Sequence, residues 1–273
     1  MKMKGMFFSV IVLLLSLTLL GFTFLLFRSN FESSASVLRM GVTDRIIDEI
    51  KSYENGLHTI LDKAVNVRTT SNAVVFIEDL PNSNAKSFPE NINSFKNFAE
   101  ARSDFFLRLN IAPNLGLRMM PSQAIYYHPR GFGNETIEVT NASTVARYSI
   151  NITINRTGAT PVSWNTTNED PNGIAFDVTV GGLTGTDFTD SKNLSRTSAS
   201  RLSIKVPGGN IEIYIGGSEN SRLVINNTNS IVAFVKTSVF FSQSSNYVTL
   251  NDQSINITAG EYNISRIDAV RVA

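Results

Sequence analysis

The sequence contains no cysteine among its 273 residues. This absence excludes disulfide bridges, thiolate metal sites and a cysteine nucleophile, so the fold must be stabilised by its hydrophobic core alone. Histidine is scarce too, with only His58 and His128. The two histidines do not have zinc-binding spacing, and each is expected to be an ordinary surface or packing residue rather than a general base or a metal ligand.

The chain also lacks a surplus of charge. Its 24 Lys and Arg nearly balance its 23 Asp and Glu, which leaves a formal net charge of +1. A nucleic-acid partner or a strongly acidic partner usually requires a basic surface. We therefore expect no nucleic acid among the partners.

Known catalytic motifs are missing as well. No serine lies in a nucleophile-elbow pattern, and the glycine-rich run 181–186 lacks both the Walker lysine and the full dinucleotide fingerprint. Residues 168–173, and Asp187 with Asp190, could supply calcium ligands, but they match no EF-hand loop and are typical of turns. The sequence therefore predicts no enzyme, no catalytic residue, no cofactor and no metal site.

One long hydrophobic run is present, at residues 6–27, directly after a short basic leader at 1–5. A helix of that length, at about 1.5 Å per residue, extends over roughly 33 Å and can cross a bilayer core of about 30 Å. The alternative is a cleavable secretory signal, whose apolar region usually covers about 7 to 15 residues before a small-x-small site. Length and flanking residues favour a retained membrane helix.

The charges beside this run predict its orientation. Lys2, Lys4 and the amino terminus precede it, whereas only Arg28 follows it closely. The positive-inside rule then favours a cytoplasmic N-terminus. We expect a single-pass protein of the cell membrane whose C-terminal domain is extracellular.

The leader has a recognisable form. Lys4 and Gly5 are followed directly by Met6-Phe7-Phe8-Ser9-Val10-Ile11-Val12-Leu13-Leu14-Leu15. This arrangement resembles the class III leader of type IV pilins and archaeal pilin-like proteins, and the resemblance is confined to residues 1–30. It implies that a prepilin-type leader peptidase cuts between Gly5 and Met6, so that the helix stays on the chain and can pack in a filament core. Many of those pilins have a glutamate at the fifth mature position, where this sequence has Val10.

Residues 29–66 are predicted to continue the first helix as an amphipathic helix. Their apolar positions recur at spacings of three and four, with charged residues between them. These positions are Val42, Ile46, Ile50, Tyr53, Leu57, Ile60 and Ala64. Such a stripe is consistent with a filament-lining contact and also with packing against the protein's own head domain.

The connecting region, 67–133, is predicted to mix helix and strand. Residues 73–77 are apolar and β-branched, as in a buried strand, whereas 81–89 is expected to be a polar loop. A helix is predicted from a second stripe, formed by Phe95, Phe98, Arg102, Phe105 and Leu109. Residues 113–133 fit neither period, so we expect a loop or irregular strands and a boundary there.

From 134 to 273 the period is two, which predicts a β-rich extracellular domain. Residues 148–155 alternate apolar and polar side chains, and 202–206 and 211–215 form a hairpin pattern around Pro-Gly-Gly-Asn. Further strands are expected at 222–225, 231–241, 247–250, 254–258 and 262–272. The predicted fold class is therefore α+β, with an N-terminal membrane helix, an amphipathic continuation and a mainly antiparallel, β-sandwich-like head.

Glycosylation motifs are concentrated in the same β-rich region. Nine of its seventeen asparagines lie in Asn-x-Ser/Thr motifs, whereas none of the eleven earlier asparagines does. The acceptors are Asn134, Asn141, Asn151, Asn155, Asn165, Asn193, Asn226, Asn256 and Asn263. Chance predicts about four. We expect a glycosylated outer domain; the alternative is a surface rich in Thr and Asn that matches the motif without carrying sugar.

Together these features predict a type IV pilin-like surface subunit, anchored or polymerised through its apolar helix, with a glycosylated head for adhesion or assembly. Its expected partners are membrane lipid, the leader peptidase and further pilin-like subunits, either as a homo-oligomer or in a surface filament. A monomeric, signal-anchored surface glycoprotein that binds a partner or a polysaccharide is one alternative. An anchored extracellular enzyme is another, although no residue spacing supports it.

Overall fold

The computed structural model describes residues 3–103, 105–111, 115–129, 135–155, 161–182, 186–229, 231–243, 247–251, 253–259 and 262–266. It describes the backbone alone at 3–12, 34–39, 106, 111, 253–259 and 262–266. The chain belongs to the predicted α+β class, and its strands are mostly antiparallel. It divides into two compact units, residues 1–51 and 52–273.

A single helix, α1 (Met3–Ala64), forms the described part of the first unit and continues into the second. The segments predicted at 6–28 and 29–66 thus form one uninterrupted helix as far as Ala64, and Asn66 already begins the first strand. Between Leu13 and Phe27 the large apolar side chains are 49–74% exposed. Because they point in all directions around the helix, this stretch has no polar face.

The last three turns of α1 are different because they belong to the second unit. Tyr53, Leu57 and Leu61 are buried there, while Asn55, Thr59 and Asp62 are exposed. Spacings of four residues place the three apolar side chains on one face of the helix. Of the predicted stripe, Tyr53, Leu57 and Ala64 are therefore buried in this part of the helix. The predicted Ile60 is only half-buried, and its neighbour Leu61 takes the buried position instead.

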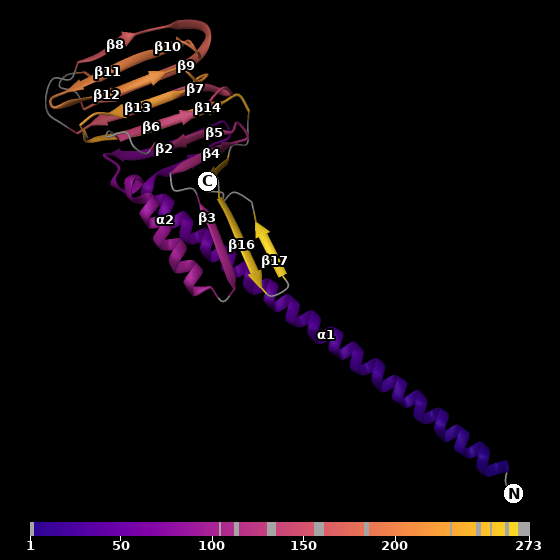
Figure 1. Cartoon of the computed structure of the whole chain (residues 1–273). Coiled ribbons are helices and arrows are strands. Elements are labelled where there is room, and N and C mark those ends of the chain that lie inside the picture. The colour runs from indigo at the N-terminus through magenta and orange to yellow at the C-terminus, as the bar shows by residue number, and fades with distance from the viewer. Residues whose placement is uncertain are drawn as a thin grey trace. The chain divides into compact units, whose positions relative to one another are not determined.

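Two large sheets form most of the second unit (Figure 1). The first contains, in spatial order, β1 (Asn66–Thr69), β2 (Ala73–Leu80), β14 (Ala233–Phe241), β7 (Val145–Ile154), β9 (Glu169–Gly181) and β10 (Phe188–Leu194). All neighbouring pairs in it are antiparallel except β7 and β9, which are parallel.

The second large sheet is antiparallel throughout. In spatial order it contains β15 (Tyr247–Leu250), β4 (Gly116–Met120), β5 (Ala124–Tyr127), β6 (Glu135–Thr140), β13 (Leu223–Asn227), β12 (Gly209–Ile215), β11 (Ser200–Val206) and β8 (Val162–Thr166). The predicted hairpin of 202–215 is β11 with β12, paired from Ser200–Ile215 to Val206–Gly209.

The two sheets pack face to face and share one core. Phe76 of the first sheet stacks on Tyr126 of the second, with ring centroids 3.8 Å apart. At the other end, Trp164 meets Phe176 edge to face at 5.9 Å. Both sheets contain strands from 67–133 and from 134–273, and strands of the two regions pair directly, as in β2/β14 and β5/β6. The two regions therefore build a common sandwich.

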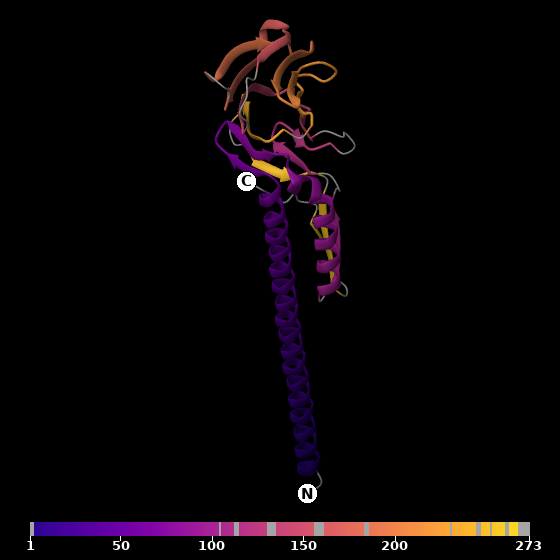
Figure 2. The ribbon, with the colours of Figure 1, turned by 90° about the vertical axis from the view of Figure 1, so that its left-hand side faces the viewer.

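A smaller layer completes the second unit. The strands β3 (Phe106–Ile111), β16 (Gln253–Ala259) and β17 (Tyr262–Arg266) form a three-stranded antiparallel sheet. Helix α2 (Ser83–Arg102) lies beside this sheet in both views (Figures 1 and 2) and contacts β3. Tyr53 of α1 meets Phe95 of α2 edge to face at 6.4 Å.

The connecting region differs from its prediction in three places. Within 113–133, expected to be a loop or irregular strands, β4 and β5 are regular antiparallel neighbours in the second large sheet. The expected loop at 81–89 begins α2 instead, because Asn82 caps the helix by accepting a hydrogen bond from the Ala85 N–H at 2.8 Å. The expected helix ends at Arg102, and Leu109 belongs to β3. A spacing of four, as from Phe105 to Leu109, fits a strand as well as a helix, so it could not distinguish the two.

Candidate functional site: the apolar helix and the sequon faces

Within the described residues, one helical stretch is long and apolar enough to cross a membrane. It covers Leu13–Ser33, 21 residues with a mean hydropathy of 1.5, and none of it is buried. Near its end, Arg28 and Glu32 form an exposed ion pair one turn apart, with Nε and Oε1 separated by 2.9 Å. By length and composition, an apolar helix near the N-terminus is compatible with a membrane anchor and with a signal sequence.

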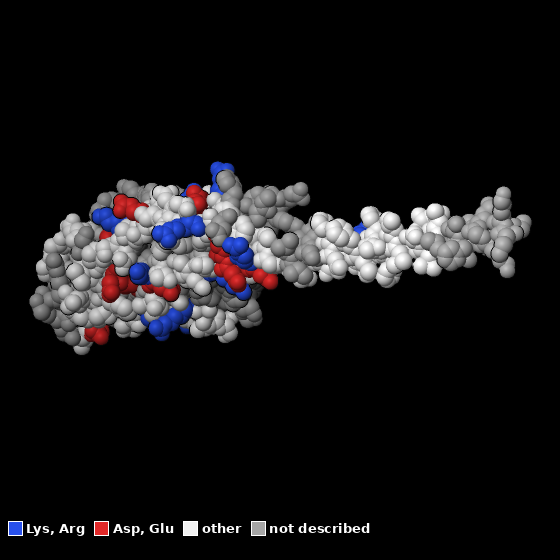
Figure 3. Space-filling model, turned by 90° about the horizontal axis from the view of Figure 1, so that it is seen from below, with Lys and Arg blue, Asp and Glu red and all other residues white. Residues whose placement is uncertain are grey.

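The two threonine hydroxyls of this stretch are satisfied within the helix. The Thr18 hydroxyl donates to the Leu15 carbonyl at 2.9 Å, and the Thr23 hydroxyl donates to the Leu19 carbonyl. A hydroxyl that bonds to its own helix needs no water, which lowers the cost of placing it in hydrocarbon. Charge is also scarce here: the described part of this segment shows almost none in the space-filling view, whereas charges of both signs are scattered over the second unit (Figure 3).

The proposed leader lies at the start of α1. The Gly5–Met6 bond falls within the part of the helix for which only the backbone is described, and Lys2 lies outside the described residues.

Three sequon asparagines lie on the outer face of the first large sheet. Asn151 is on β7 and Asn155 follows its last residue, while Asn193 is on β10. All three are exposed, and the alternating residues Ile150, Ile152 and Ile154 are buried in the core. The alternation in the sequence thus placed Asn151 and Asn155 on the correct face.

The other sequons differ in how accessible they are. Asn141, in the turn after β6, and Asn165 on β8 are exposed, although Nδ2 of Asn165 donates to the Ser203 hydroxyl at 2.8 Å. Asn226 on β13 is half-buried, and its Oδ1 accepts a hydrogen bond from Thr136 at 3.4 Å. Asn134 lies outside the described residues, and Asn256 and Asn263 are described by their backbone alone.

A buried polar cluster, which the sequence did not predict, connects the sheets to both helices. At its centre is Glu78 on β2, whose side chain is 1% exposed. Its Oε2 lies 2.9 Å from Nε2 of His128 and accepts a hydrogen bond from Nδ2 of Asn82 at 2.7 Å. Its Oε1 accepts a hydrogen bond from the hydroxyl of Tyr126. The signal for this cluster was a pair of adjacent carboxylates, Glu78 and Asp79, near the end of an otherwise apolar strand.

Asn82 extends the cluster to the ends of the two helices. Besides capping α2, its Nδ2 donates to the carbonyl of Ala64, the last residue of α1, at 2.6 Å. Its backbone N–H donates to Oε2 of Glu135 at 2.6 Å. The cluster therefore fixes the point at which α1 ends and the first strands begin.

The cluster also shifts the acidities of its members. Burial raises the pKa of Glu78, but the charge of His128 and the hydrogen bonds outweigh it and hold the pKa below its ordinary value. Burial lowers the pKa of His128, but the charge of Glu78 outweighs it and raises the pKa above its ordinary value. Burial together with Glu78 raises the pKa of Tyr126. The result is an ion pair that is largely buried, with the side chain of Glu78 1% and that of His128 13% exposed, and that joins β2 to the end of β5.

A second carboxylate, Glu212, lies on the outer face of the other large sheet. It accepts hydrogen bonds from Arg201 and Tyr214, and from Nδ2 of Asn210 at 2.7 Å. Burial raises its pKa, but these hydrogen bonds and the charge of Arg201 lower it to a net value below the ordinary one. Because its acceptor positions are occupied, this carboxylate is also structural.

The described residues that could have held calcium serve in local structure. Oδ1 of Asp170 accepts a hydrogen bond from the Asn172 N–H at 2.9 Å, which closes a turn. Oδ2 of Asp190 accepts one from the Trp164 indole at 2.7 Å. Among the described residues, no group of three or more His, Asp or Glu is arranged to hold a metal ion.

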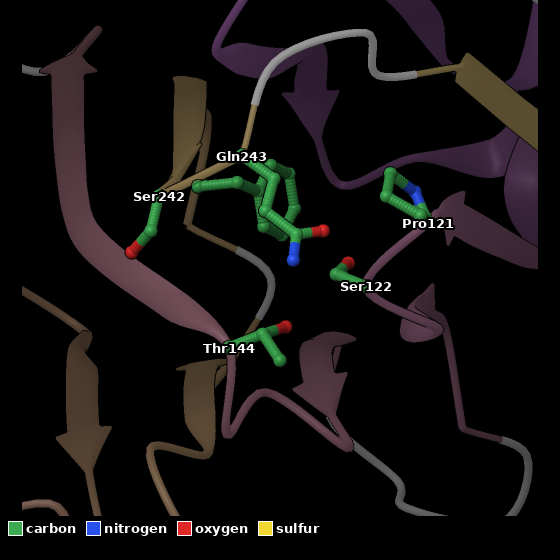
Figure 4. Close-up of a pocket in the computed structure, with 6 residues that line it drawn as sticks. Pro121, Ser122, Thr144, Ser242 and Gln243 are labelled. Carbon is green, nitrogen blue, oxygen red and sulfur yellow. The ribbon is translucent and has the colours of Figure 1, made fainter.

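One small cavity of about 160 Å³ lies at the end of β14 (Figure 4). Its lining consists of Pro121, Ser122, Thr144, Phe241, Ser242 and Gln243. The Gln243 amide points between Ser122 and Thr144. These lining residues include no group that titrates near neutral pH, so they provide no acid or base.

Comparisons with protein families, curated proteins and solved structures find no significant match to this chain.

Proposed function

We propose that this chain is a type IV pilin-like surface subunit. Its apolar helix resides in the membrane or in the core of a filament, and its β-rich unit lies outside the cell. The observation that carries the proposal is the change of character along α1. From Leu13 to Phe27 the helix has no polar face and nothing covers its large apolar side chains, while its last turns are built into the head. The first part therefore needs lipid or neighbouring apolar helices around it.

The proposed maturation step is a cut between Gly5 and Met6 by a prepilin-type leader peptidase. A cut at this bond lies before the apolar run, so the run would remain attached to the head. Cleavage behind the run, as in a secretory signal, would remove it. The continuous helix from Met3 to Ala64 is consistent with an apolar segment that stays attached to the head.

The proposal includes a glycosylated outer surface. Its support is the exposure of Asn141, Asn151, Asn155, Asn165 and Asn193, where a bulky sugar can be attached without disturbing the core. Asn226 is the exception, because it is half-buried and bonded to Thr136. We expect no sugar at Asn226 in the folded protein, and mass spectrometry of glycopeptides would identify which sites are occupied.

A pair of glycine variants tests the maturation step. Gly5→Val should block the cut, so that the protein keeps its leader and is absent from sheared filaments. Gly21→Val is the matched control, since a Cβ at Gly21 meets nothing within 4 Å; it should be processed normally. Mature-length protein from Gly5→Val would contradict the proposal.

The second candidate is a monomeric, signal-anchored surface glycoprotein. It is favoured by Val10, which stands where many pilins have the glutamate associated with assembly. This candidate predicts a chain that keeps its leader and that chemical cross-linking in the native membrane leaves as a monomer. Cross-linked ladders of this subunit would argue against it.

A further inference from the structure

Two exposed apolar side chains lie next to each other on the outer face of the first large sheet. Val232 is 47% and Phe234 is 42% exposed. Among the described residues of the second unit, the only other large apolar side chain so exposed is Phe98, on α2. Phe234 lies on β14, a central strand with partners on both sides. An aromatic ring left open in the middle of a sheet suggests that something covers it.

Strand register places two sequons beside this ring. Phe234 pairs directly with Thr153 of β7 and, on its other side, with Asp79 of β2. Asn151 and Asn155 lie two residues before and after Thr153, so both are diagonal neighbours of Phe234. Diagonal neighbours on one face are about 7–8 Å apart, which aromatic side chains can bridge.

Of these two asparagines, Asn155 has the more apolar surroundings. Its backbone N–H donates to the Val232 carbonyl at 3.2 Å, so it lies beside Val232 as well as diagonal to Phe234. Asn151 instead pairs with Lys236. A sugar attached to Asn155 would thus begin over an apolar floor made by Val232 and Phe234.

We propose that Val232 and Phe234 form a docking platform for the first sugar of an asparagine-linked glycan at Asn155. The aliphatic hydrogens of a sugar ring present an apolar surface that can lie on the face of an aromatic ring, while its hydroxyl groups remain in water. The covalent bond to Asn155 keeps the sugar at a high local concentration beside the platform, which favours the sugar over any free partner. The platform rests on the glycosylation included in the proposed function.

A double-mutant cycle on the full-length glycoprotein, purified from its native membrane, tests the platform. Asn155→Gln removes the sugar and Phe234→Thr removes the ring while keeping a strand-forming residue. We expect Asn155→Gln to lower the Tm of the head by about 2–4 °C when Phe234 is present, and to have no effect when it is absent. Equal shifts in both backgrounds would overturn the platform.

Asn193 provides the matched control on the same face. It pairs with Ala175 of β9, which offers the sugar no aromatic ring. Asn193→Gln should therefore shift the Tm equally with and without Phe234. Should Phe234→Thr fail to fold, nuclear Overhauser contacts between Phe234 ring protons and sugar protons in the unmutated protein decide the matter. Their presence supports the platform, and their absence from an occupied site overturns it.

Which sequons carry sugar distinguishes a failure of the platform from a failure of the proposed glycosylation. Sugar at other sequons with none at Asn155 overturns the platform and leaves the glycosylated surface intact. No sugar at any sequon overturns both. A second copy of this chain could cover the ring instead of a sugar. The platform is overturned in favour of that occupant if the head dimerises, Phe234→Thr abolishes the dimer and the ring makes no contact with sugar.

Discussion

The two ends of α1 contain similar apolar residues in opposite environments, exposed at one end and buried at the other. From Leu13 to Phe27 the leucine and phenylalanine side chains are 49–74% exposed, whereas Leu57 and Leu61 near the other end are 0% and 1% exposed. The difference lies in the residues between them: in the first part apolar residues fill every side, while in the second they recur every third or fourth position. Leucine in the first part is therefore available to lipid or neighbouring helices, and in the second it stabilises the head.

The largest effect is expected from a charge placed in the apolar first part of α1. Leu15→Arg should abolish membrane retention, because a charged residue near the middle of a membrane helix costs about 2.5–3.5 kcal/mol or more. Carbonate extraction of cell membranes measures it. The control is Ile47→Arg on the same helix, outside the apolar run and 42% exposed, which should remain membrane-bound.

The same truncation at the two ends should give different results. Leu57→Ala should destabilise the head by about 2–5 kcal/mol, because it opens a cavity in the core. Leu17→Ala, at a side chain that is 60% exposed, should leave thermal unfolding of the head unchanged. Equal effects of the two variants would show that the two parts of the helix do not differ as described.

The end of α1 at Ala64 should also respond to pH, through the cluster of Glu78, His128 and Asn82. His128 has a raised pKa, so its contribution is complete below its ordinary value of 6.5 and is lost as the pH rises through the folded value. Glu78 has a lowered pKa, so its contribution is present above its ordinary value of 4.5 and is lost as the pH falls through the folded value. The ion pair therefore stabilises the head most between pH 4.5 and 6.5.

We expect the Tm of the head to fall from pH 6.5 toward alkaline pH, and His128→Gln to remove much of that fall. His58 is the only other histidine in the chain, which makes His58→Gln the natural control. An unchanged pH profile for His128→Gln would mean that the pair does not hold the end of the helix.

The smallest expected effect concerns the glycines of α1. A Cβ at Gly56 would lie 2.5 Å from Cε2 of Phe95, so Gly56→Ala should crowd the contact with α2. Overpacking costs about 1–3 kcal/mol, and the gain in helix propensity of about 1 kcal/mol offsets part of it. We expect a small net loss of head stability for Gly56→Ala. Gly41→Ala, where a Cβ meets nothing within 4 Å, should show no loss.

Local sequence patterns predicted those elements in which buried and exposed residues follow each other with a regular period. The strand expected at 247–250 is β15 (Tyr247–Leu250), and the alternation of 148–155 places its residues on the correct faces. The strands β9 and β10 were not expected, because their Asp, Asn, Gly and Pro residues are also typical of turns.

Contacts between distant residues could not be predicted from spacing. Glu78 and His128 meet because β2 and β5 lie in opposing sheets, and nothing in either segment specifies how those sheets are superposed. The same holds for Phe234, whose apolar character was visible in the sequence, while its position beside two sequons depends on the register of β14 with β7.

In the proposed maturation, the apolar helix is retained after a cut directly before it. The most direct test reads the N-terminal peptide of the protein from native membranes or sheared filaments by mass spectrometry. We expect a chain that begins at Met6 with residues 6–27 still attached. A chain that begins at Met1 would contradict pilin-like maturation, and one that begins behind Phe27 would contradict the retained helix itself.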